Sequence, residues 1–233
     1  MTTAAPEQTI TERLVSALTA AWRAIQGEHS EVPDVVLALG SGTLGKRGGE
    51  TTLGHFAAGR WQLADAGEGD QGLHELFVSG EGLRRGAAEV LATLLHEAAH
   101  GLAAARGVVD TSRQGRYHNK RFKALGEELG LVITEAGTLG WSGTALGPQA
   151  QERYADVLDH LAAAMTAFRR AEVAGLPGKS KSKNLLVAEC ACPRKIRVAR
   201  STLDAAPITC GACGEQFTAP DDDEDGAEDS ADE

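Results

Sequence analysis

The chain has 233 residues, 42% of them hydrophobic, which is enough for one domain of about 100 to 150 residues and a smaller module. The formal net charge is −10, but nine acidic residues lie in the last thirteen positions, and residues 1–220 together have a net charge of only −1. No apolar run approaches the roughly 18 residues of a membrane span, and residues 1–7 do not resemble a signal peptide, so we expect a soluble cytoplasmic protein without a membrane partner.

Hydrophobic spacing predicts a first helix over residues 10–25, with Gly27 as a stop signal. Short apolar segments at residues 35–39, 56–63 and 75–78, punctuated by glycines, predict three strands of one small antiparallel sheet. Further helices are predicted over residues 86–106, 118–129 and 149–173. The pattern indicates an α+β fold.

Composition divides the rest of the chain. Residues 176–184 are small, polar and charged, which is typical of a linker, and residues 185–219 contain all four cysteines. The acidic end is typical of a disordered, solubilising tail. We therefore predict a main domain over residues 8–147, a long helix over 148–175, a linker over 176–184, a cysteine module over 185–219 and a tail over 220–233.

The first chemical motif, His96-Glu97-Ala98-Ala99-His100, lies inside the helix predicted at residues 86–106. Residues four apart share a helix face, so both imidazoles can reach one zinc ion at about 2.0 to 2.1 Å. Glu97 points elsewhere, but can deprotonate a water at the open coordination position, and the ion polarises the carbonyl that this water attacks. The motif predicts peptide hydrolysis; the alternative is a surface helix with two incidental histidines.

A catalytic zinc takes three protein ligands, so a third must exist. His118 is the best candidate, because it is in phase with Phe122, Leu125 and Leu129 and therefore faces inward at the start of a predicted helix. A carboxylate from Glu127 or Glu128 is the alternative ligand. The remaining histidines near predicted strands are His55 and His74, which we interpret as ordinary polar or outer-shell positions.

The cysteines form two short knuckles, Cys190-Ala-Cys192 and Cys210-Gly-Ala-Cys213, separated by seventeen residues. Four thiolates in this arrangement predict one closed, structural zinc site, with a disulfide pair or free thiols as the alternative. A hairpin rich in β-branched residues is expected to join the knuckles, and its candidate members are Ile196, Val198, Thr202, Ile208 and Thr209.

Basic residues gather in and before the cysteine module, where seven face only three acidic residues between positions 176 and 219. Such a cluster can contact the phosphates of nucleic acid, although a basic surface is often merely solvated. The candidates are Lys179, Lys181, Lys183, Arg194, Lys195, Arg197 and Arg200. The acidic tail raises a second possibility, that it folds back on the cysteine module and competes with DNA.

Together these motifs resemble the SprT-like (Spartan-related) zinc metallopeptidases. The resemblance rests on the motif at residues 96–100, on Tyr117-His118-Asn119-Lys120-Arg121-Phe122, on residues 59–61 and 75–79, and on the later cysteines. It implies a zincin-like catalytic domain, with catalytic zinc on His96, His100 and His118, with Glu97 catalytic, and with a zinc ribbon on the cysteines. It further implies proteolysis of DNA-bound or DNA-crosslinked proteins. The residues beside His118 and the long helix at 148–175 depart from the family pattern.

The sequence therefore supports two alternative functions. The first is a zinc peptidase that acts on protein near DNA, with one catalytic and one structural zinc and with the ribbon as targeting module. The alternative is a non-catalytic nucleic-acid-binding or scaffold protein with two structural zinc sites. Glu97 favours the enzyme, because a purely structural site has no use for a carboxylate beside the open coordination position.

Overall fold

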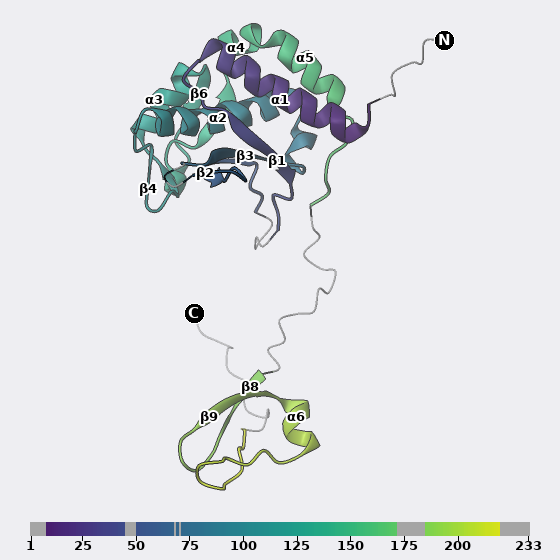
Figure 1. The fold of residues 1–233 in the computed structure, drawn as a ribbon, viewed down its shortest axis with the longest axis vertical. Coiled ribbons are helices and arrows are strands. Elements are labelled where there is room, and N and C mark those ends of the chain that lie inside the picture. Colours follow the sequence, from purple (N-terminus) through teal and green to yellow (C-terminus); the bar gives the residue numbers. More distant parts are fainter. Residues whose placement is uncertain (1–7, 45–49, 68, 70, 172–184, 220–233) are drawn as a thin grey trace, which may run out of the picture. The chain divides into compact units, whose positions relative to one another are not determined.

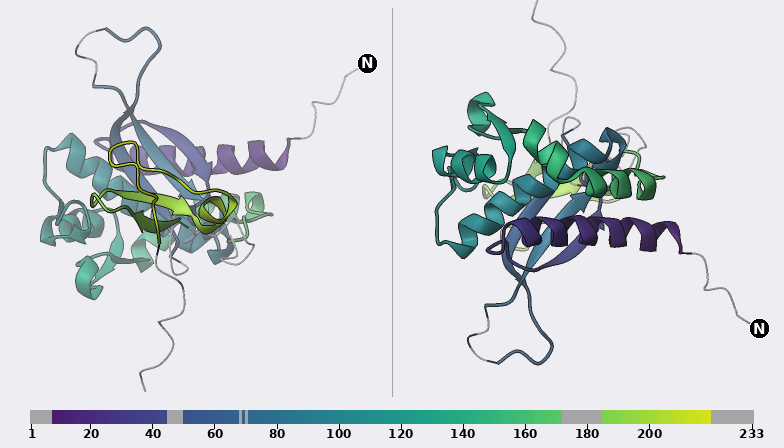
Figure 2. Two further views of the ribbon diagram at one scale, coloured as in Figure 1. Left: turned by 90° about the horizontal axis from the view of Figure 1, so that it is seen from below. Right: turned by 90° about the horizontal axis from the view of Figure 1, so that it is seen from above.

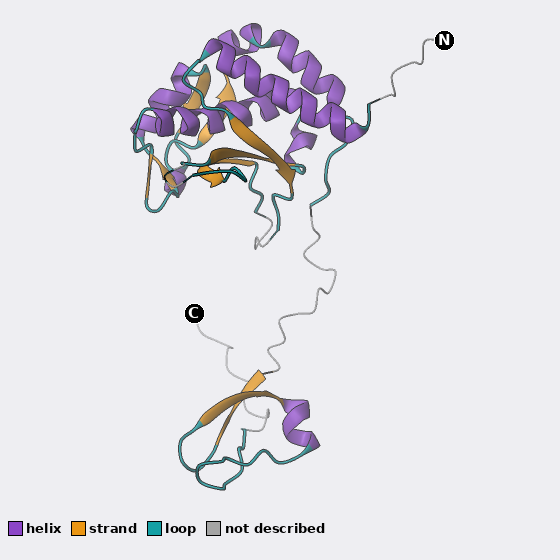
Figure 3. Ribbon diagram, in the orientation of Figure 1, coloured by secondary structure: helices purple, strands orange, loops and turns teal. Residues whose placement is uncertain are grey.

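The computed structural model describes residues 8–44, 50–67, 69, 71–171 and 185–219, which belong to two units, Met1–Glu172 and Val173–Glu233 (Figure 1). The described residues form a mixed α+β structure with four small sheets and six α-helices (Figure 3). None of the helices in these ranges is long and apolar enough to cross a membrane. The lysines at 179, 181 and 183 and the acidic tail at 220–233 lie outside the described residues.

Helix α1 (Ile10–Glu28) confirms the first predicted helix. It begins with a capping box, in which the Thr9 hydroxyl accepts from the Glu12 N–H while the Glu12 carboxylate accepts from the Thr9 N–H. Its buried stripe includes Leu18, Trp22 and Ile25, and the Trp22 indole donates to the carbonyl of Pro33 at 3.1 Å. These contacts fix the helix against the start of the sheet.

The main sheet is mixed, not antiparallel as predicted. Its strands β1 (Val35–Gly40), β2 (Gly54–Trp61) and β3 (Leu73–Ser79) lie in the order β1-β3-β2, with β1 parallel and β2 antiparallel to β3. The chain passes the central position after β1, forms the far edge as β2, and returns between the two strands as β3. A rule that pairs consecutive strands misses this order. Strand β2 is therefore an edge strand.

Helix α2 (Ala87–Ala105) follows a short 3₁₀ turn, η1 (Gly82–Arg85), and carries the predicted apolar stripe. Figures 1 and 2 show α1, α2 and the later helix α5 (Ala155–Ala164) on one face of the sheet. The core lies between these layers, where side chains of α2 such as Leu91, Leu95 and Leu102 are fully buried.

A hairpin and a short helix follow α2. Strands β4 (Thr111–Ser112) and β5 (Tyr117–His118) pair antiparallel, and helix α3 (Lys120–Glu128) begins immediately after them. His118 was expected inside this helix, but it ends β5, because Asn119 has an extended backbone and its side chain caps α3 by accepting from the N–H groups of Arg121 and Phe122. Strands β6 (Leu131–Thr134) and β7 (Gly143–Leu146) then pair, with a 3₁₀ turn, η2 (Gly137–Leu139), between them.

The long helix predicted over residues 149–173 is wrong. The chain forms α4 (Pro148–Arg153), leaves helical geometry at Tyr154, forms α5 and leaves it again at Met165. The following residues are not helical, because Arg169 is held elsewhere: its N–H donates to the Gly80 carbonyl at 2.9 Å and its guanidinium pairs with Glu81 at 2.6 Å. Since α5 packs on α1, this part of the chain belongs to the first unit.

The second unit contains β8 (Leu185–Glu189), β9 (Lys195–Ala199) and α6 (Arg200–Ala205) (Figure 3). The two strands pair antiparallel on either side of the first cysteine knuckle. The expected hairpin between the knuckles is therefore wrong in part: Ile196 and Val198 are in β9, but Thr202 is in α6. Thr209 forms only an isolated bridge with Gln216.

Candidate metal centres

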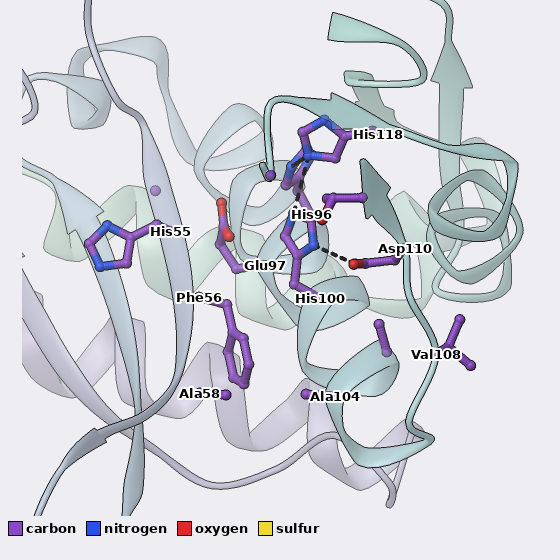
Figure 4. A pocket seen from close by; sticks show the side chains of 14 residues that line it. His55, Phe56, Ala58, His96, Glu97, His100, Ala104, Val108, Asp110 and His118 are labelled. Carbon is purple, nitrogen blue, oxygen red and sulfur yellow. Dashed lines mark hydrogen bonds and ion pairs between the residues drawn. The ribbon is translucent and has the colours of Figure 1, made fainter. Parts of the chain in front are cut away.

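The three histidines of the first unit converge, although they come from two elements. His96 and His100 lie one turn apart on α2, and His118 reaches them from β5 (Figure 4). The His118 Nε2 atom lies 3.2 Å from the Nε2 atoms of both His96 and His100. Two nitrogen ligands of one tetrahedral zinc are about 3.3 Å apart for bond lengths of 2.0 to 2.1 Å. The three imidazoles therefore fit a metal ion.

Hydrogen bonds at the opposite ring nitrogens orient two of these imidazoles. The Nδ1–H of His100 donates to Oδ2 of Asp110 at 2.6 Å (Figure 4). The Nδ1–H of His118 donates to the carbonyl of Leu139 at 3.4 Å. Each bond leaves Nε2 without a proton and directed at the shared centre, which is the arrangement that metal-binding histidines use. Asp110 was not identified from the sequence, because its distance from the motif carries no periodic signal.

Phe122 forms the apolar floor of this centre. It is fully buried, and its ring centroid lies 4.7, 4.8 and 4.5 Å from those of His96, His100 and His118. Burial lowers the pKa of His96 well below its usual value, with further lowering from the neighbouring histidines, and burial likewise lowers the pKa of His118. The imidazoles of His96 and His118 are therefore neutral at physiological pH, as metal ligands must be.

Glu97 lies on α2 beneath strand β2, on the side of the pocket opposite His118 (Figure 4). It is only 5% exposed, and burial raises its pKa to about 7, although His100 and a hydrogen bond from the Phe56 N–H act in the other direction. Gly54 permits this fit: a Cβ at that position would lie 3.0 Å from Oε1 of Glu97 and 2.9 Å from Cγ2 of Thr93. A carboxyl group with such a pKa can both accept and return a proton near neutral pH.

The three histidines and Glu97 open into a pocket of about 510 Å³. One wall is β2, which contributes Gly54, Phe56 and Ala58, and the other comes from α2 and the segment from Val108 to His118. His55 reaches the rim but points away from the histidines, bonded to Glu75 at 2.8 Å (Figure 4). His74 instead accepts from the N–H of Gly59.

The carboxylates considered as alternative third ligands are engaged elsewhere. Glu128 pairs with Arg106 at 2.8 Å, and Glu127 pairs with Lys123 at 3.6 Å on the surface of α3. Among the described residues, the group that can share one ion in this unit is His96, His100 and His118. The alternative of Glu127 or Glu128 as ligand is therefore wrong.

The four cysteines of the second unit form a separate cluster. All four are free, and their Sγ atoms lie within 4.8 Å of one another, with 3.7 Å between Cys192 and Cys210 and 3.9 Å between Cys190 and Cys213. Thiolates of one tetrahedral zinc are about 3.8 Å apart for bonds of 2.3 Å. Hydrogen bonds from the N–H groups of Ala212 and Cys213 lower the pKa of Cys210 to about 6, which favours a thiolate ligand. The cluster fits a closed, four-sulfur metal site.

The basic residues predicted to meet nucleic acid are only partly described. Arg194, Lys195, Arg197 and Arg200 lie in or beside β9, and Lys195 is already paired with Glu189 at 2.6 Å.

Comparisons with protein-family models, with curated proteins and with solved structures found no match for the chain.

Proposed function

We propose that the protein is a zinc-dependent peptidase with a zincin-like catalytic unit and a zinc ribbon. The observation that carries the proposal is the convergence of three imidazoles and one buried carboxyl group at an open pocket. His96, His100 and His118 would hold a zinc ion, which would supply the Lewis acidity to polarise a carbonyl group and to make a water molecule more acidic. A second zinc on the four cysteines would have only a structural role.

Glu97 performs the proton transfers in this proposal. Its carboxylate accepts a proton from the water as the water oxygen bonds to the peptide carbonyl carbon. The same group then gives that proton to the departing amine nitrogen as the C–N bond breaks, which restores the carboxylate. A pKa near neutrality suits both steps, because neither protonation state is strongly favoured.

The sheet edge supports a peptide as substrate. In an antiparallel strand, alternate residues direct their backbone groups to opposite sides, and the bond from the Phe56 N–H to Glu97 shows that Phe56 directs its N–H away from β3. Gly54, two residues earlier in the regular part of β2, shares that direction. An extended peptide can pair with this edge and bring a carbonyl group to the histidines.

The proposal extends to DNA-associated or DNA-crosslinked proteins as substrates. This part rests on the resemblance to SprT-like peptidases and on the basic residues near the ribbon. Arginine and lysine side chains there would contact phosphates and give binding that weakens with salt.

The substitution Glu97→Gln tests the proposed chemistry. It keeps the shape of the side chain but removes the base, so cleavage of an unfolded or DNA-bound protein should fall by about 10²- to 10⁴-fold while metal content stays unchanged. Glu89→Gln is the matched control, because Glu89 lies on the same helix but on the surface, paired with Arg85. Equal cleavage by the Glu97→Gln and wild-type proteins, or a wild-type protein that cleaves nothing with or without DNA, would leave the non-catalytic alternative.

A further inference from the structure

The pocket of the histidine centre has an apolar end that the proposed chemistry does not use. Five apolar residues line this end, and we call them the apolar wall: Phe56, Ala58, Ala103, Ala104 and Val108. Figure 4 labels all of them except Ala103, and in that view they lie below the histidines and Glu97. Ala58 and Ala104 are exposed, and Phe56 and Val108 are half-buried, so a molecule in the pocket can reach them.

Helix α2 places part of the apolar wall next to a candidate metal ligand. Ala103 and Ala104 follow His100 by three and four residues, so they share its face of the helix, about one turn or 5.4 Å further along the axis. A group bonded to an ion on the histidines would therefore have its neighbouring atoms within reach of the wall. Both residues are alanines, whose short side chains leave the space in front of the helix open.

The end of α2 fixes Val108 at the pocket. The Val108 N–H donates to the Ala103 carbonyl at 2.8 Å, and the Gly107 N–H donates to the Ala104 carbonyl at 3.2 Å, which are the two bonds of a Schellman motif. Gly107 permits this turn, because its φ of 63° lies in the left-handed region that glycine adopts easily. The chain therefore turns directly after the helix and holds Val108 against its last turn.

Strand β2 supplies the opposite side of the apolar wall. The Phe56 ring packs against α2 at Gly101, where a Cβ would lie 3.5 Å from Cε2 of the ring. The centroid of the same ring lies 5.3 Å from that of His74. Contacts on two sides hold the ring in place, so the wall is a preformed surface, and binding to it does not require the wall to be ordered first.

The apolar wall offers no partner to a charged group. Among the described residues that line the pocket, none is a lysine or an arginine, and the carboxyl groups are those of Glu97 and Asp110. Asp110 is already bonded to His100 at 2.6 Å. A charged side chain at the wall would lose water without gaining an ion pair, which is unfavourable. An apolar side chain would instead gain free energy by leaving water.

We propose that the apolar wall selects substrates by binding a large apolar side chain, such as that of leucine or phenylalanine, on a residue next to the cleaved peptide bond. Such side chains are mostly buried in folded proteins, so this preference also favours unfolded segments as substrates. The residues of the wall take no part in the chemistry and determine only specificity. The proposal rests on the proposed function, because it concerns the same site.

Two metal-binding probes test the wall without a cleavage assay. Acetohydroxamate and 3-phenylpropanohydroxamate share one chelating group, but the second compound also has a phenyl ring. The full-length protein is loaded with Co²⁺, and the visible absorption of its three-nitrogen site reports the binding of each probe. We expect the phenyl compound to bind about 10- to 100-fold more tightly, because hydrophobic pockets discriminate between apolar groups by about this factor.

Substitutions in the wall should remove this difference. Ala104→Phe fills the space in front of the wall and should abolish the preference for the phenyl compound. Val108→Thr keeps the shape of the side chain but adds a hydroxyl group, and should weaken binding of the phenyl compound alone. Ala105→Phe is the matched control and should keep the full preference, because Ala105 is the next residue on α2, is exposed and lies outside the pocket lining.

Three results would overturn the proposal: equal affinity of the wild type for the two probes, an unchanged preference in Ala104→Phe, or an equal loss of preference in Ala105→Phe. Cleavage separates this proposal from the proposed function. In a digest of an unfolded protein, the wild type should cut beside large apolar residues, and Ala104→Phe should lose that preference. A wild type that prefers the phenyl compound but cleaves nothing would refute only the proposed function, whereas cleavage without any residue preference would refute only the role of the wall.

Discussion

Asp110 determines the orientation and the tautomer of the His100 imidazole. The bond between them is short, and both side chains are largely shielded from water, with 14% and 18% of their surfaces exposed. The Asp110 backbone is held in turn, since its carbonyl accepts from the Asn119 N–H at 3.0 Å. The carboxylate therefore fixes both the tautomer and the angle of the imidazole before any ion arrives.

Replacing Asp110 should weaken metal binding at the histidines. We expect Asp110→Ala to lower the affinity for Co²⁺ by about 10- to 100-fold, because the imidazole loses its orientation. Asp110→Asn should retain part of the affinity, since its amide oxygen can still accept from Nδ1–H. Visible absorption separates the three-nitrogen Co²⁺ site from the thiolate site, and Asp156→Ala, at an exposed acid on α5, is the control. Equal affinities for all variants would show that Asp110 has no positioning role.

Glu81 joins three elements that are distant in sequence. Its carboxylate accepts from the Gly42 N–H after β1 and from the Ser79 hydroxyl at the end of β3, and it pairs with Arg169 after α5. Burial alone would raise its pKa, but these bonds hold it at about 2. The group thus fastens the segment after α5 to the sheet.

The contacts of Glu81 predict that the free energy of unfolding depends on pH. Because the folded pKa of Glu81 lies below the unfolded value of about 4.3, its contribution is complete above that value and is lost as the pH falls toward 2. The free energy of unfolding of Glu81→Gln should be about 2 to 3 kcal/mol lower than that of the wild type at pH 7. The difference should shrink below pH 4 in urea titrations. Glu89→Gln should show no such trend, and a difference independent of pH would contradict the assignment.

The elements differ in how far the sequence predicts them. The helices around residues 10–25 and 86–106 follow from local periodicity, and so does the pairing of His96 with His100. The order β1-β3-β2 and the contact of Asp110 with His100 depend on tertiary packing, which leaves no local pattern. The end of α5 at Met165 contradicts the predicted helical pattern, because the chain after it is held at the sheet by the contacts of Arg169 with Gly80 and Glu81.

At the scale of the molecule, the two units have different sources of stability. The first has an apolar core built from α1, α2, α3, α5 and the sheet. In the described part of the second unit, the buried side chains are Ala188, Cys190, Val198 and Cys210, so two of the four are cysteines. We therefore expect the second unit to fold only with a bound ion.

Removing a cysteine should therefore unfold one unit and spare the other. In Cys210→Ser, amide protection of residues 185–219 should be lost, while that of α1 to α5 stays unchanged, because the first unit has an apolar core of its own. Ser201→Ala, at an exposed position of α6, is the control. Retained protection in Cys210→Ser would show that the second unit folds without a metal ion, and lost protection in both units would show that they fold together.

The assembly of the histidine centre depends on the formation of two separate elements during folding. His96 and His100 come into place as soon as α2 forms, because they are one turn apart, whereas His118 arrives only when the β4–β5 hairpin docks and Asn119 starts α3. A nascent chain that has made the helix but not the hairpin offers an ion two ligands instead of three. All three histidines therefore converge only in a chain in which α2 and the β4–β5 hairpin have both formed and have packed against each other.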